Sequence, residues 1–595
     1  MSLSPSQGRS ERGMPGTVEM TDKRSKNEFI KEKSHQLRGT LAEGLRQVET
    51  GAIAEDDQQL IKFHGSYIQD DRDVRGERSK KKLEKAYAFM IRLRIPGGFL
   101  GAKQWIGLDN IASTYANGSM RLTTRETFQF HGVIKSNLKR TMQGFHDICL
   151  DTLAACGDVN RNVMTAANPD LSKAHRQAYD LGKEISEHLL PKTGAYHEIW
   201  LDGEKVEDKS GPAKEDVEPI YGVHYLPRKF KVVVAVPPDN DVDIYAHDLG
   251  YIAIVEKGEL VGWNVTVGGG MGMTHGDPNT FPRTADLLGF CTPEQAVTLA
   301  EKIVTVQRDW GNRENRARAR LKYTIEDRGL DNFREEVEKR AGFKLGKPKP
   351  FKFASTGDKI GWRQTIDGKK SADKPWHLTL FVENGRIKDR PGFTLRTALR
   401  EIADLGICDF VCTANQNVIL ANVPGKSKAK IEGILTSHGV ELGVSSGLRR
   451  NAMACVALPT CGLALAESER FLPDLVTALE ESLDRAGLKD DDIVIRMTGC
   501  PNGCARPYLA EIGLVGRNPG LYNLYLGAAF NGSRLSKLYA QDVDKQRIVS
   551  LLEPIFINYA KTRNDGERFG DFAIRSGYVK ETTAGNQFHA DVKLV

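Results

Sequence analysis

Four of the nine cysteines lie in two pairs, and their types and spacing could do redox chemistry. Cys455 and Cys461 have five residues between them, and Cys500 and Cys504 are separated by Pro-Asn-Gly. Thiolates are soft ligands, so four that converge from two loops could hold zinc or an iron–sulfur cluster. Structural zinc sites usually take each thiolate pair from a tighter turn, so the wider spacing favours a [4Fe–4S] cluster.

The residues between the second pair suit a loop around a cluster. Pro501 cannot donate a backbone hydrogen bond, and Gly503 permits a positive φ that brings backbone N–H groups toward cluster sulfurs. A disulfide and structural zinc stay open as alternatives, although an odd cysteine count disfavours the disulfide. We predict that the other cysteines are dispensable for cofactors: Cys149, Cys156, Cys291, Cys408 and Cys412.

The two cysteine-containing segments, 454–470 and 498–506, resemble the signature of the sirohaem and [4Fe–4S] nitrite and sulfite reductases. In form they are nearest the assimilatory sulfite reductase hemoproteins of the beta-subunit type, and the resemblance covers about residues 63–572. It implies that all four cysteines bind the cluster and that Cys504 also bridges to the sirohaem iron. It also implies a six-electron reduction of sulfite to hydrogen sulfide, in sulfate assimilation.

That reaction takes sulfur from +4 to −2 and needs protons to release oxygen as water, so positive charge is expected at the site. Lys229 and Lys231 are two residues apart at the start of an apolar strand and would project to one face. A solvated strand end is the simpler interpretation, but the resemblance assigns both to the substrate. It also assigns Arg92 and Arg161 to anion binding, with Arg94 as the nearest competitor for Arg92.

Sirohaem is rich in carboxylates, so its pocket needs several cations. His131 is not expected to be an axial iron ligand, because the resemblance gives that position to Cys504. The Gly268–Gly272 segment is not a nucleotide fingerprint, and we expect it to approach the tetrapyrrole closely. The resemblance assigns Arg121 and Arg125 to the sirohaem pocket. We predict cofactor binding also by Arg320 and Lys322, by His131 through a hydrogen bond to a carboxylate, and by Gln129 and Asn502.

The elements that must position these residues occur twice. Sliding the sequence against itself by 289 residues (450 − 161) places Arg161 on Arg450 and the strand-like run 87–96 on 376–385, without a gap. Residues 103–115 carry apolar residues at helical spacing, and 120–134 returns to strand-like patterning. The pattern predicts an ancient duplication in which only the second copy carries the cluster cysteines.

The resemblance implies an α+β fold with duplicated, pseudo-symmetric ferredoxin-like half-domains and two larger α/β cofactor-binding domains. We expect the N-terminal segment to wrap over later domains. The predicted boundaries are a disordered arm at 1–27, an extended N-terminal segment at 28–86, a first half-domain at 87–153, a sirohaem and substrate domain at 154–342, a linker at 343–375, a second half-domain at 376–442 and a cluster domain at 443–595.

Composition indicates a globular protein rather than a membrane or nucleic-acid-binding one. Hydrophobic residues make up 40%, and no apolar run approaches the length of a membrane span. The formal charge of +6 (84 − 78) is mild, and the basic residues are interspersed with acidic ones. Residues 1–27 contain no apolar core of a signal peptide, so we expect a cytoplasmic protein.

The electrons must come from another protein, because no flavin or nicotinamide domain can be placed in the sequence. The resemblance leaves two donors open, a flavoprotein reductase subunit and a ferredoxin. A nitrite reductase of the same family is the main alternative, although such enzymes more often have serine where this loop has Gly503. An iron–sulfur electron carrier or sensor without catalysis is the non-enzyme alternative.

Overall fold

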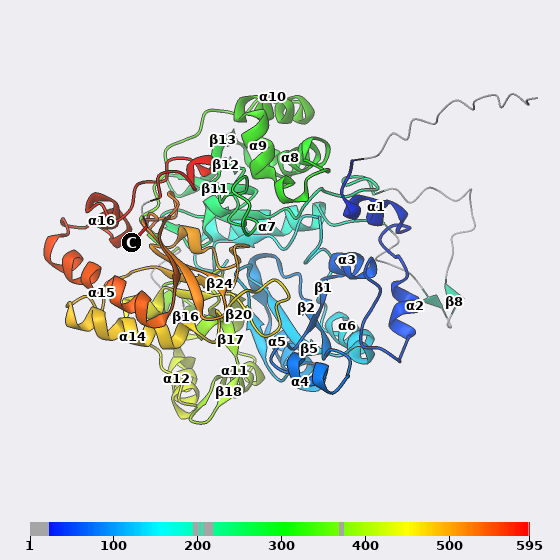
Figure 1. Cartoon of the computed structure of the whole chain (residues 1–595), viewed down its shortest axis with the longest axis horizontal. Coiled ribbons are helices and arrows are strands. Elements are labelled where there is room, and N and C mark those ends of the chain that lie inside the picture. The colour runs from blue at the N-terminus through cyan, green and yellow to red at the C-terminus, as the bar shows by residue number, and fades with distance from the viewer. Residues whose placement is uncertain (1–22, 194–199, 202–203, 206–217, 368–373, 593) are drawn as a thin grey trace, which may run out of the picture.

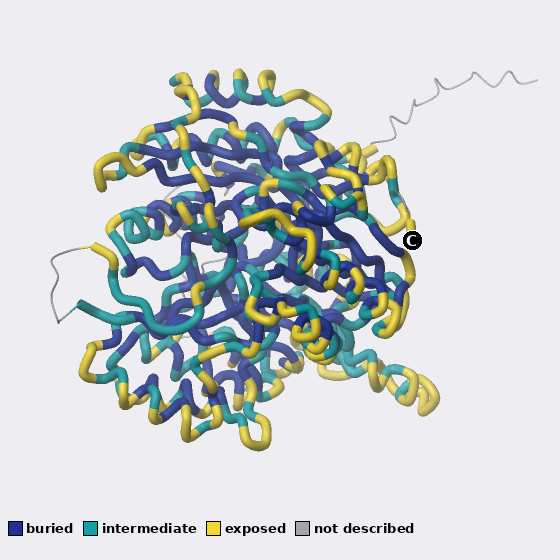
Figure 2. Tube along the Cα trace, turned by 90° about the vertical axis from the view of Figure 1, so that its left-hand side faces the viewer, coloured by how far each residue is buried: buried dark blue, intermediate teal, exposed yellow. Residues whose placement is uncertain are grey.

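The computed structural model describes residues 23–193, 200–201, 204–205, 218–367, 374–592 and 594–595, so most of the predicted arm at 1–27 lies outside the described residues. Helices and sheets are mixed throughout (Figure 1), which confirms the α+β prediction. The buried trace runs through the centre of the molecule, and exposed residues lie mainly in its outer turns (Figure 2). No helix in the described part of the chain is long and apolar enough to cross a membrane.

The N-terminal segment is helical over much of its length, whereas the sequence suggested an extended arm. The reason is tertiary packing, because Ile30, Leu37 and Leu60 are buried against the first larger domain. The backbone N–H of Ser25 also bonds to the carbonyl of Arg313 at 2.9 Å, so the segment does contact a later domain. Its elements are α1 (Lys26–Lys33), α2 (Leu41–Arg46), α3 (Asp57–Leu60), η1 (Ile61–His64), β1 (Ser66–Asp70) and α4 (Arg75–Lys80).

Two half-domains then repeat one order of elements. The first contains β2 (Tyr87–Arg92), η2 (Pro96–Gly98), β3 (Phe99–Leu100), α5 (Ala102–Tyr115), β4 (Met120–Leu122), β5 (Phe128–Val133), η3 (Lys135–Asn137) and α6 (Leu138–Asp147). The second contains β16 (Trp376–Leu380), η7 (Glu383–Gly385), β17 (Arg386–Ile387), β18 (Asp389–Arg390), β19 (Phe393–Thr394), α11 (Leu395–Asp404), β20 (Asp409–Cys412), β21 (Val418–Val423), η8 (Gly425–Ser427) and α12 (Lys428–Ser437).

The half-domains exchange their shortest strands. β3 of the first copy pairs with β20 of the second, and β17 of the second pairs with β4 of the first. The resulting five-stranded sheets have the orders β1-β2-β5-β4-β17 and β15-β16-β21-β20-β3. Both sheets pack on one hydrophobic core, in which the rings of Trp105 and Phe410 stack with centroids 4.3 Å apart. The two half-domains therefore form one structural unit, in which a pseudo-two-fold axis relates one copy to the other.

The larger domains repeat as well. Each has a five-stranded sheet in which the first three strands in chain order pair in parallel, and the fourth and fifth each pair antiparallel with the strand before. The duplication therefore extends over almost the whole chain. The first sheet contains β6 (Met164–Thr165), β9 (Val232–Ala235), β11 (Leu249–Glu256), β12 (Glu259–Val267) and β13 (Asp286–Cys291), and the second β22 (Ala452–Ala454), β23 (Ile495–Thr498), β24 (Ile512–Asn518), β25 (Leu521–Leu526) and β26 (Lys537–Val543).

Helices cover these two sheets, and each larger domain has its own hydrophobic core. Gly487 follows the end of α14 with a positive φ of 72°, a conformation that glycine adopts without strain. In Figure 1 α8, α9 and α10 lie together at one end of the molecule, and α14 and α15 lie side by side. The helices are α7 (Lys173–His188), α8 (Ala296–Trp310), α9 (Leu321–Arg328), α10 (Leu330–Ala341), α13 (Gly447–Arg450), α14 (Leu472–Arg485), α15 (Lys545–Thr562) and α16 (Phe569–Arg575).

The predicted linker contributes strands as well as a connection. Its composition is rich in Lys, Gly and Pro, but β15 (Gly361–Gln364) adds to the edge of the second half-domain sheet beside β16. Trp362 fixes this edge, because its indole N–H donates to Glu432 at 2.7 Å. A second short strand, β14 (Ser355–Thr356), pairs with β10 (Asp239–Asn240) of the first larger domain.

A buried charge cluster joins the two larger domains. Asp243 and Arg506 hold equivalent positions in the repeat, each with a positive φ (49° and 55°) immediately before a short 3₁₀ helix, η4 (Ile244–Ala246) or η9 (Pro507–Leu509). The Asp243 carboxylate accepts hydrogen bonds from Arg506 and, at 2.7 and 3.2 Å, from Arg496. Burial alone would raise the pKa of Asp243, but the two guanidiniums outweigh it and hold the pKa below its usual range.

We expect Asp243→Asn to lower the free energy of unfolding by about 3–5 kcal/mol, because two buried guanidiniums would lose their counter-charge. Since the folded-state pKa is depressed, this stabilisation should be present above the unfolded-state pKa and be lost as the pH falls through the folded value. Urea unfolding at neutral and acidic pH measures both effects. Asp571→Asn, which removes a half-exposed ion pair with Arg534, should cost less than about 1 kcal/mol, and an equal loss in both variants would contradict the expectation.

Candidate iron–sulfur and anion site

The four cysteines of the two pairs lie on loops that leave one edge of the second larger sheet. Cys455 directly follows β22, and Cys500 comes two residues after β23. These strands are parallel neighbours, so their following loops meet at the same edge of the sheet. The structure therefore brings the two pairs together as the sequence predicts.

Backbone N–H groups point at the cysteine sulfurs. Gly499 donates to the Cys455 sulfur at 3.3 Å, and the backbone N–H groups of Leu463 and Ala464 oppose the rise in the pKa of the Cys461 thiol. Donors of this kind stabilise thiolates and cluster sulfurs. The loop chemistry expected from the spacing is present.

The electrostatics of the four thiols also fit a metal cluster. Burial raises the pKa of Cys500 to about 12 and that of Cys455 and Cys461 above the usual value, and the nearby Cys504 adds to each rise. Four thiolates this close need a cationic partner to stay deprotonated. The donor set thus fits a cluster of iron ions.

The two alternatives for these cysteines are not supported. All nine cysteines are free, which is against a disulfide. In the part of the chain that the structure describes, no group of three or more His, Cys, Asp or Glu side chains is arranged to hold a single metal ion. An iron–sulfur cluster, which each of the four thiolates would bind at a different iron, is the interpretation that remains.

The glycine-rich Gly268–Gly272 segment packs against the second cysteine loop. A Cβ on Gly503, whose φ is +61°, would lie 3.0 Å from the carbonyl oxygen of Met271, and the N–H of Met273 donates to the carbonyl of Pro501 at 3.0 Å. Gly269 likewise sits too close to the carbonyl of Tyr245 to carry a side chain. The close approaches that the structure shows are between protein loops, and the expected approach to the tetrapyrrole stays a prediction.

Lys229 and Lys231 lie just before β9, with Phe230 buried between them. The Phe230 backbone continues the ladder, because it pairs with Asn160, so both lysines project to the same side as expected. Neither ammonium has a hydrogen bond or ion pair to any residue that the structure describes, and both keep some solvent contact although protein surrounds them on most sides. Cations of this kind call for an anionic occupant.

The charges nearby keep these lysines easy to deprotonate until an anion arrives. Burial, with Arg161 and Arg320 nearby, lowers the pKa of Lys229 to about 7, while Cys504 acts in the opposite direction. Burial and the neighbouring Lys229 lower the pKa of Lys231 further. The influence of Cys504 places the lysines beside the second cysteine loop.

The predicted anion-binding arginines lie together with two residues that sequence reasoning did not select. Arg92 donates to the sulfur of Cys156 at 2.9 Å and lies over the ring of Tyr67 at 6.0 Å. Arg161 bonds to the carbonyl of Gly157 at 3.1 and 3.2 Å and to the Tyr67 hydroxyl. Only the pairing of β1 with β2 brings Tyr67 here, and the sequence does not show that register.

Arg94 does not compete with Arg92. Its guanidinium forms a two-point contact with Asp151, at 2.5 and 3.0 Å. The geometry thus assigns Arg94 to a structural ion pair.

Three of the predicted cofactor residues form a row across one sheet face. Gln129 on β5 pairs with Arg92 on β2 and with Arg121 on β4, and His131 follows on the same face of β5. Phe128 and Phe130 point into the core from the other face. This alternation matches the strand pattern of the sequence.

His131 is buried and its Nδ1 has no partner among the described residues. Burial, together with Arg386 and Arg121, lowers the pKa of His131, so the ring is neutral. Asn502 donates its side-chain N–H to the sulfur of Cys500 at 3.5 Å. Hydrogen bonds from both residues to a cofactor stay predictions.

The other predicted cofactor cations already bind protein groups. Lys322 donates to the carbonyls of Gly270 and Gly272 at 3.2 and 2.6 Å, and also to that of Phe281. Arg320 makes a two-point contact with Asp248, Arg125 donates to the carbonyls of Asn162 and Val232, and Arg121 donates to those of Asn384 and Ala454. These contacts fix the loops around the site, and direct cofactor contact by the four residues stays a prediction.

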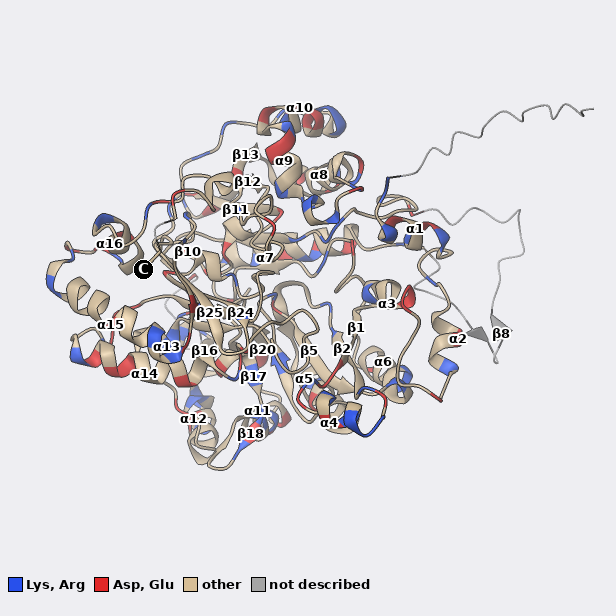
Figure 3. Ribbon diagram, in the orientation of Figure 1, with Lys and Arg blue, Asp and Glu red and all other residues tan. Residues whose placement is uncertain are grey.

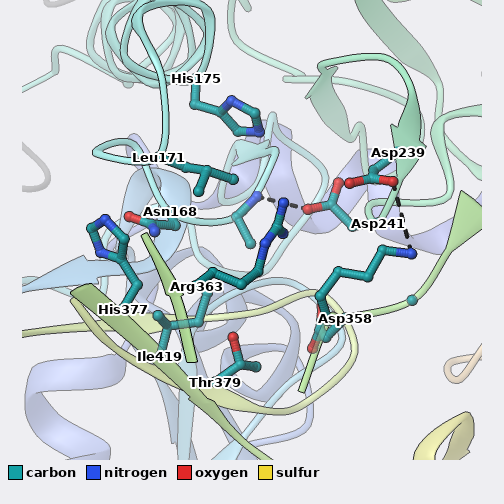
Figure 4. A pocket seen from close by; sticks show the side chains of 13 residues that line it. Asn168, Leu171, His175, Asp239, Asp241, Asp358, Arg363, His377, Thr379 and Ile419 are labelled. Atoms are coloured by element: carbon teal, nitrogen blue, oxygen red, sulfur yellow. Dashed lines mark hydrogen bonds and ion pairs between the residues drawn. The ribbon is translucent and has the colours of Figure 1, made fainter. Parts of the chain in front are cut away.

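The first repeat has a pocket at the equivalent sheet edge. It measures about 450 Å³ including its open mouth, and Asn168 and Asp241 line it from the loops after β6 and β9 (Figure 4). The guanidinium of Arg363 reaches in from β15, and burial raises the pKa of Asp241 to about 8. No cysteine lines this pocket.

Comparison with known proteins gives the same picture. The nitrite/sulfite reductase ferredoxin-like half domain matches residues 81–148 and 369–438, and the nitrite and sulphite reductase 4Fe-4S domain matches residues 183–345. Residues 183–345 lie in the first of the two larger domains, and the four cysteines lie in the second.

Relatives extend over nearly the whole chain. The "sulfite reductase [NADPH] hemoprotein beta-component" of Methylobacterium nodulans is 63% identical over 95% of this chain and 92% of its own length, and the protein of that name from Oceanobacillus iheyensis is 56% identical over 95% and 96%. The structure of Mycobacterium tuberculosis NirA protein shares the fold, with a TM-score of 0.74 at 24% identity over 93% of this chain and 96% of that one.

The repeat, the thiol set and the unpaired cations beside it define a redox enzyme that works on an anion. The chain belongs to the nitrite and sulfite reductase family.

Proposed function

We propose that the chain is the hemoprotein component of an assimilatory sulfite reductase, which reduces sulfite to hydrogen sulfide with six electrons. The names of the relatives support this function over 95% of the chain. The observation that carries it is the pair of unpartnered lysines, Lys229 and Lys231, beside Arg161 and the second cysteine loop. The expected cytoplasmic location stays a prediction.

Cys455, Cys461, Cys500 and Cys504 would hold the [4Fe–4S] cluster, with Cys504 facing the sirohaem. When bound, the two cofactors supply electrons to the sulfur atom of the substrate, which side chains cannot do. Arg92, Gln129 and Arg121, from one sheet face, would contact the sirohaem or the substrate beside it. The chain's own task is to bind the oxyanion, exclude competing anions and deliver protons.

Arg161 and Arg92 would hold the substrate oxygens, because a planar guanidinium suits an oxyanion. Lys229 and Lys231 would protonate each oxygen as it leaves as water. Their lowered pKa values are those of the ligand-free protein, and a bound anion raises the pKa of a neighbouring ammonium. Substrate binding would thus favour the charged form of both groups, which is the form able to donate a proton.

The electron donor is proposed to be a flavoprotein that oxidises NADPH, because the relatives carry NADPH in their names. A ferredoxin is the alternative donor.

Nitrite is the alternative substrate, since it is also a small anion. Comparing kcat/KM for sulfite and nitrite tests the choice, and a higher value for nitrite would overturn it.

We expect Arg161→Ala to raise KM for sulfite by about 10–100-fold, the equivalent of losing one or two charged hydrogen bonds, with a smaller effect on kcat. Steady-state rates with reduced methyl viologen measure both constants. Arg94→Ala is the matched control, because its guanidinium is held by Asp151 and should leave KM unchanged. An unchanged KM in Arg161→Ala would contradict the anion-binding role.

A further inference from the structure

Leu463 is a large apolar side chain that the fold leaves 68% exposed, on the loop of the first cysteine pair. It lies two residues after Cys461, and its backbone N–H is close enough to lower the pKa of the Cys461 thiol. A protein that touches this side chain is therefore only a few bonds from a cluster ligand. A single exposed leucine is common on protein surfaces, so its significance comes from its place on the cysteine loop and from the charged segment that packs against that loop.

The hairpin of residues 71–86 lies against the same loop. Arg72 donates to the carbonyls of Cys461 and Ala464 at 3.3 and 2.7 Å, and its backbone N–H bonds to the carbonyl of Pro459. Arg470, at the far end of the loop, forms an ion pair with Asp73 at 2.6 Å. These contacts hold the start of the hairpin against the loop that carries Leu463.

The tip of this hairpin is strongly basic. Residues 78–85 carry five positive charges and one negative charge, a net of +4. The lysines are exposed, and Figure 3 shows the basic residues gathered at the end of α4. The positive residues are Arg78, Lys80, Lys81, Lys82 and Lys85.

We propose that Leu463 and the basic hairpin 71–86, together the donor face, form the docking surface for an acidic flavoprotein that supplies the electrons. This inference rests on the proposed function and adds the place where the donor binds. Protein interfaces combine apolar contacts with charged residues at their margins, and the hairpin's positive charge favours an acidic partner. Electron-transfer complexes are often small and transient, so a limited contact of this kind is in keeping with such an encounter.

Substitutions in the donor face should weaken flavoprotein binding and slow flavoprotein-driven reduction without slowing sulfite reduction by a small chemical donor. In the cofactor-loaded protein, Lys80→Glu with Lys82→Glu should weaken flavoprotein binding at least tenfold at low salt, and leave the rate with reduced methyl viologen unchanged. Leu463→Glu should weaken binding similarly and lower the ratio of the flavoprotein-driven rate to the methyl viologen rate. Titration calorimetry gives the dissociation constants, and iron content with the visible spectrum confirms loading.

Ile557→Glu is the matched control, because Ile557 is an exposed aliphatic residue on α15. It should leave binding unchanged. Wild-type binding and flavoprotein-driven rates in both donor-face variants would overturn the proposal, as would a ferredoxin that alone shows the expected sensitivity. A wild-type protein that reduces no sulfite with methyl viologen would instead refute the proposed function, whatever the binding results.

Discussion

Replacing Cys500 with serine should remove the cluster iron and abolish sulfite reduction. A serine hydroxyl is a hard, weakly acidic ligand and does not replace a soft thiolate on iron. The same result is expected at Cys455, Cys461 and Cys504, because the four sulfurs act as one donor set. Iron and acid-labile sulfide per chain, measured with the rate of sulfite reduction, give the result.

Cys149 and Cys412 provide two controls of different kinds. Cys149 is exposed, so Cys149→Ser should keep full iron and activity. Cys412 is buried in β20, where burial raises the pKa of its thiol, and Cys412→Ala should cost some stability but no iron. If a serine variant of one of the four cysteines retains full iron and normal activity, that cysteine is not a ligand of the cluster.

Lys231→Met should lower kcat for sulfite by about 10²–10⁴-fold, the range expected on losing a general acid. Methionine keeps much of the stem's volume but removes both charge and protons. The visible spectrum of the sirohaem should persist, because the change removes no cofactor ligand. Steady-state kinetics and the spectrum of the same preparation measure the two effects.

Lys231→Arg separates charge from proton donation. Arginine keeps the positive charge but does not give up its proton in proteins, so anion binding should survive while kcat stays low. A wild-type kcat in Lys231→Met would mean that the side chain faces solvent, as the simpler interpretation of the strand holds. Recovery of kcat in Lys231→Arg would show that charge alone is needed.

The half-domains could be predicted because their repeat keeps nearly one register. β16 begins 289 residues after β2 (376 − 87), and α12 begins 290 residues after α6 (428 − 138). Periodicity then placed the strands and helices, since apolar residues alternate in β5 and follow helical spacing in α5. The convergence of the four cysteines was predicted from their spacing. In the structure it follows from the pairing of β22 with β23, the strands that precede the two cysteine pairs.

The repeat of the larger domains could be predicted only at their start, where Arg161 aligns with Arg450, because their later loops differ in length. β24 begins only 263 residues after β11 (512 − 249), so one constant offset does not reveal it. The exchange of β3 and β17 also left no signal, since a strand of two residues has no periodicity. The helices of the N-terminal segment at 28–86, for which we expected an extended conformation, depend on burial of a few apolar side chains against a later domain.

The partners of the cationic side chains depend on the fold rather than on residue type. Sequence alone gives Lys229 and Lys322 the same expectation, a cation near an anionic ligand. In the structure Lys322 is surrounded by backbone carbonyls, whereas the ammonium of Lys229 meets no partner among the described residues. That difference favours Lys229 and Lys231 as the substrate lysines over the paired cations.

Sulfide produced per electron consumed is the most direct test of sulfite reduction at this site. The purified, cofactor-loaded chain is supplied with sulfite and a known amount of reduced methyl viologen in the absence of oxygen. We predict one sulfide for every six electrons, because sulfur passes from +4 to −2. Oxidation of the dye without sulfide, or no sulfite-dependent oxidation by a fully loaded protein, would contradict the function.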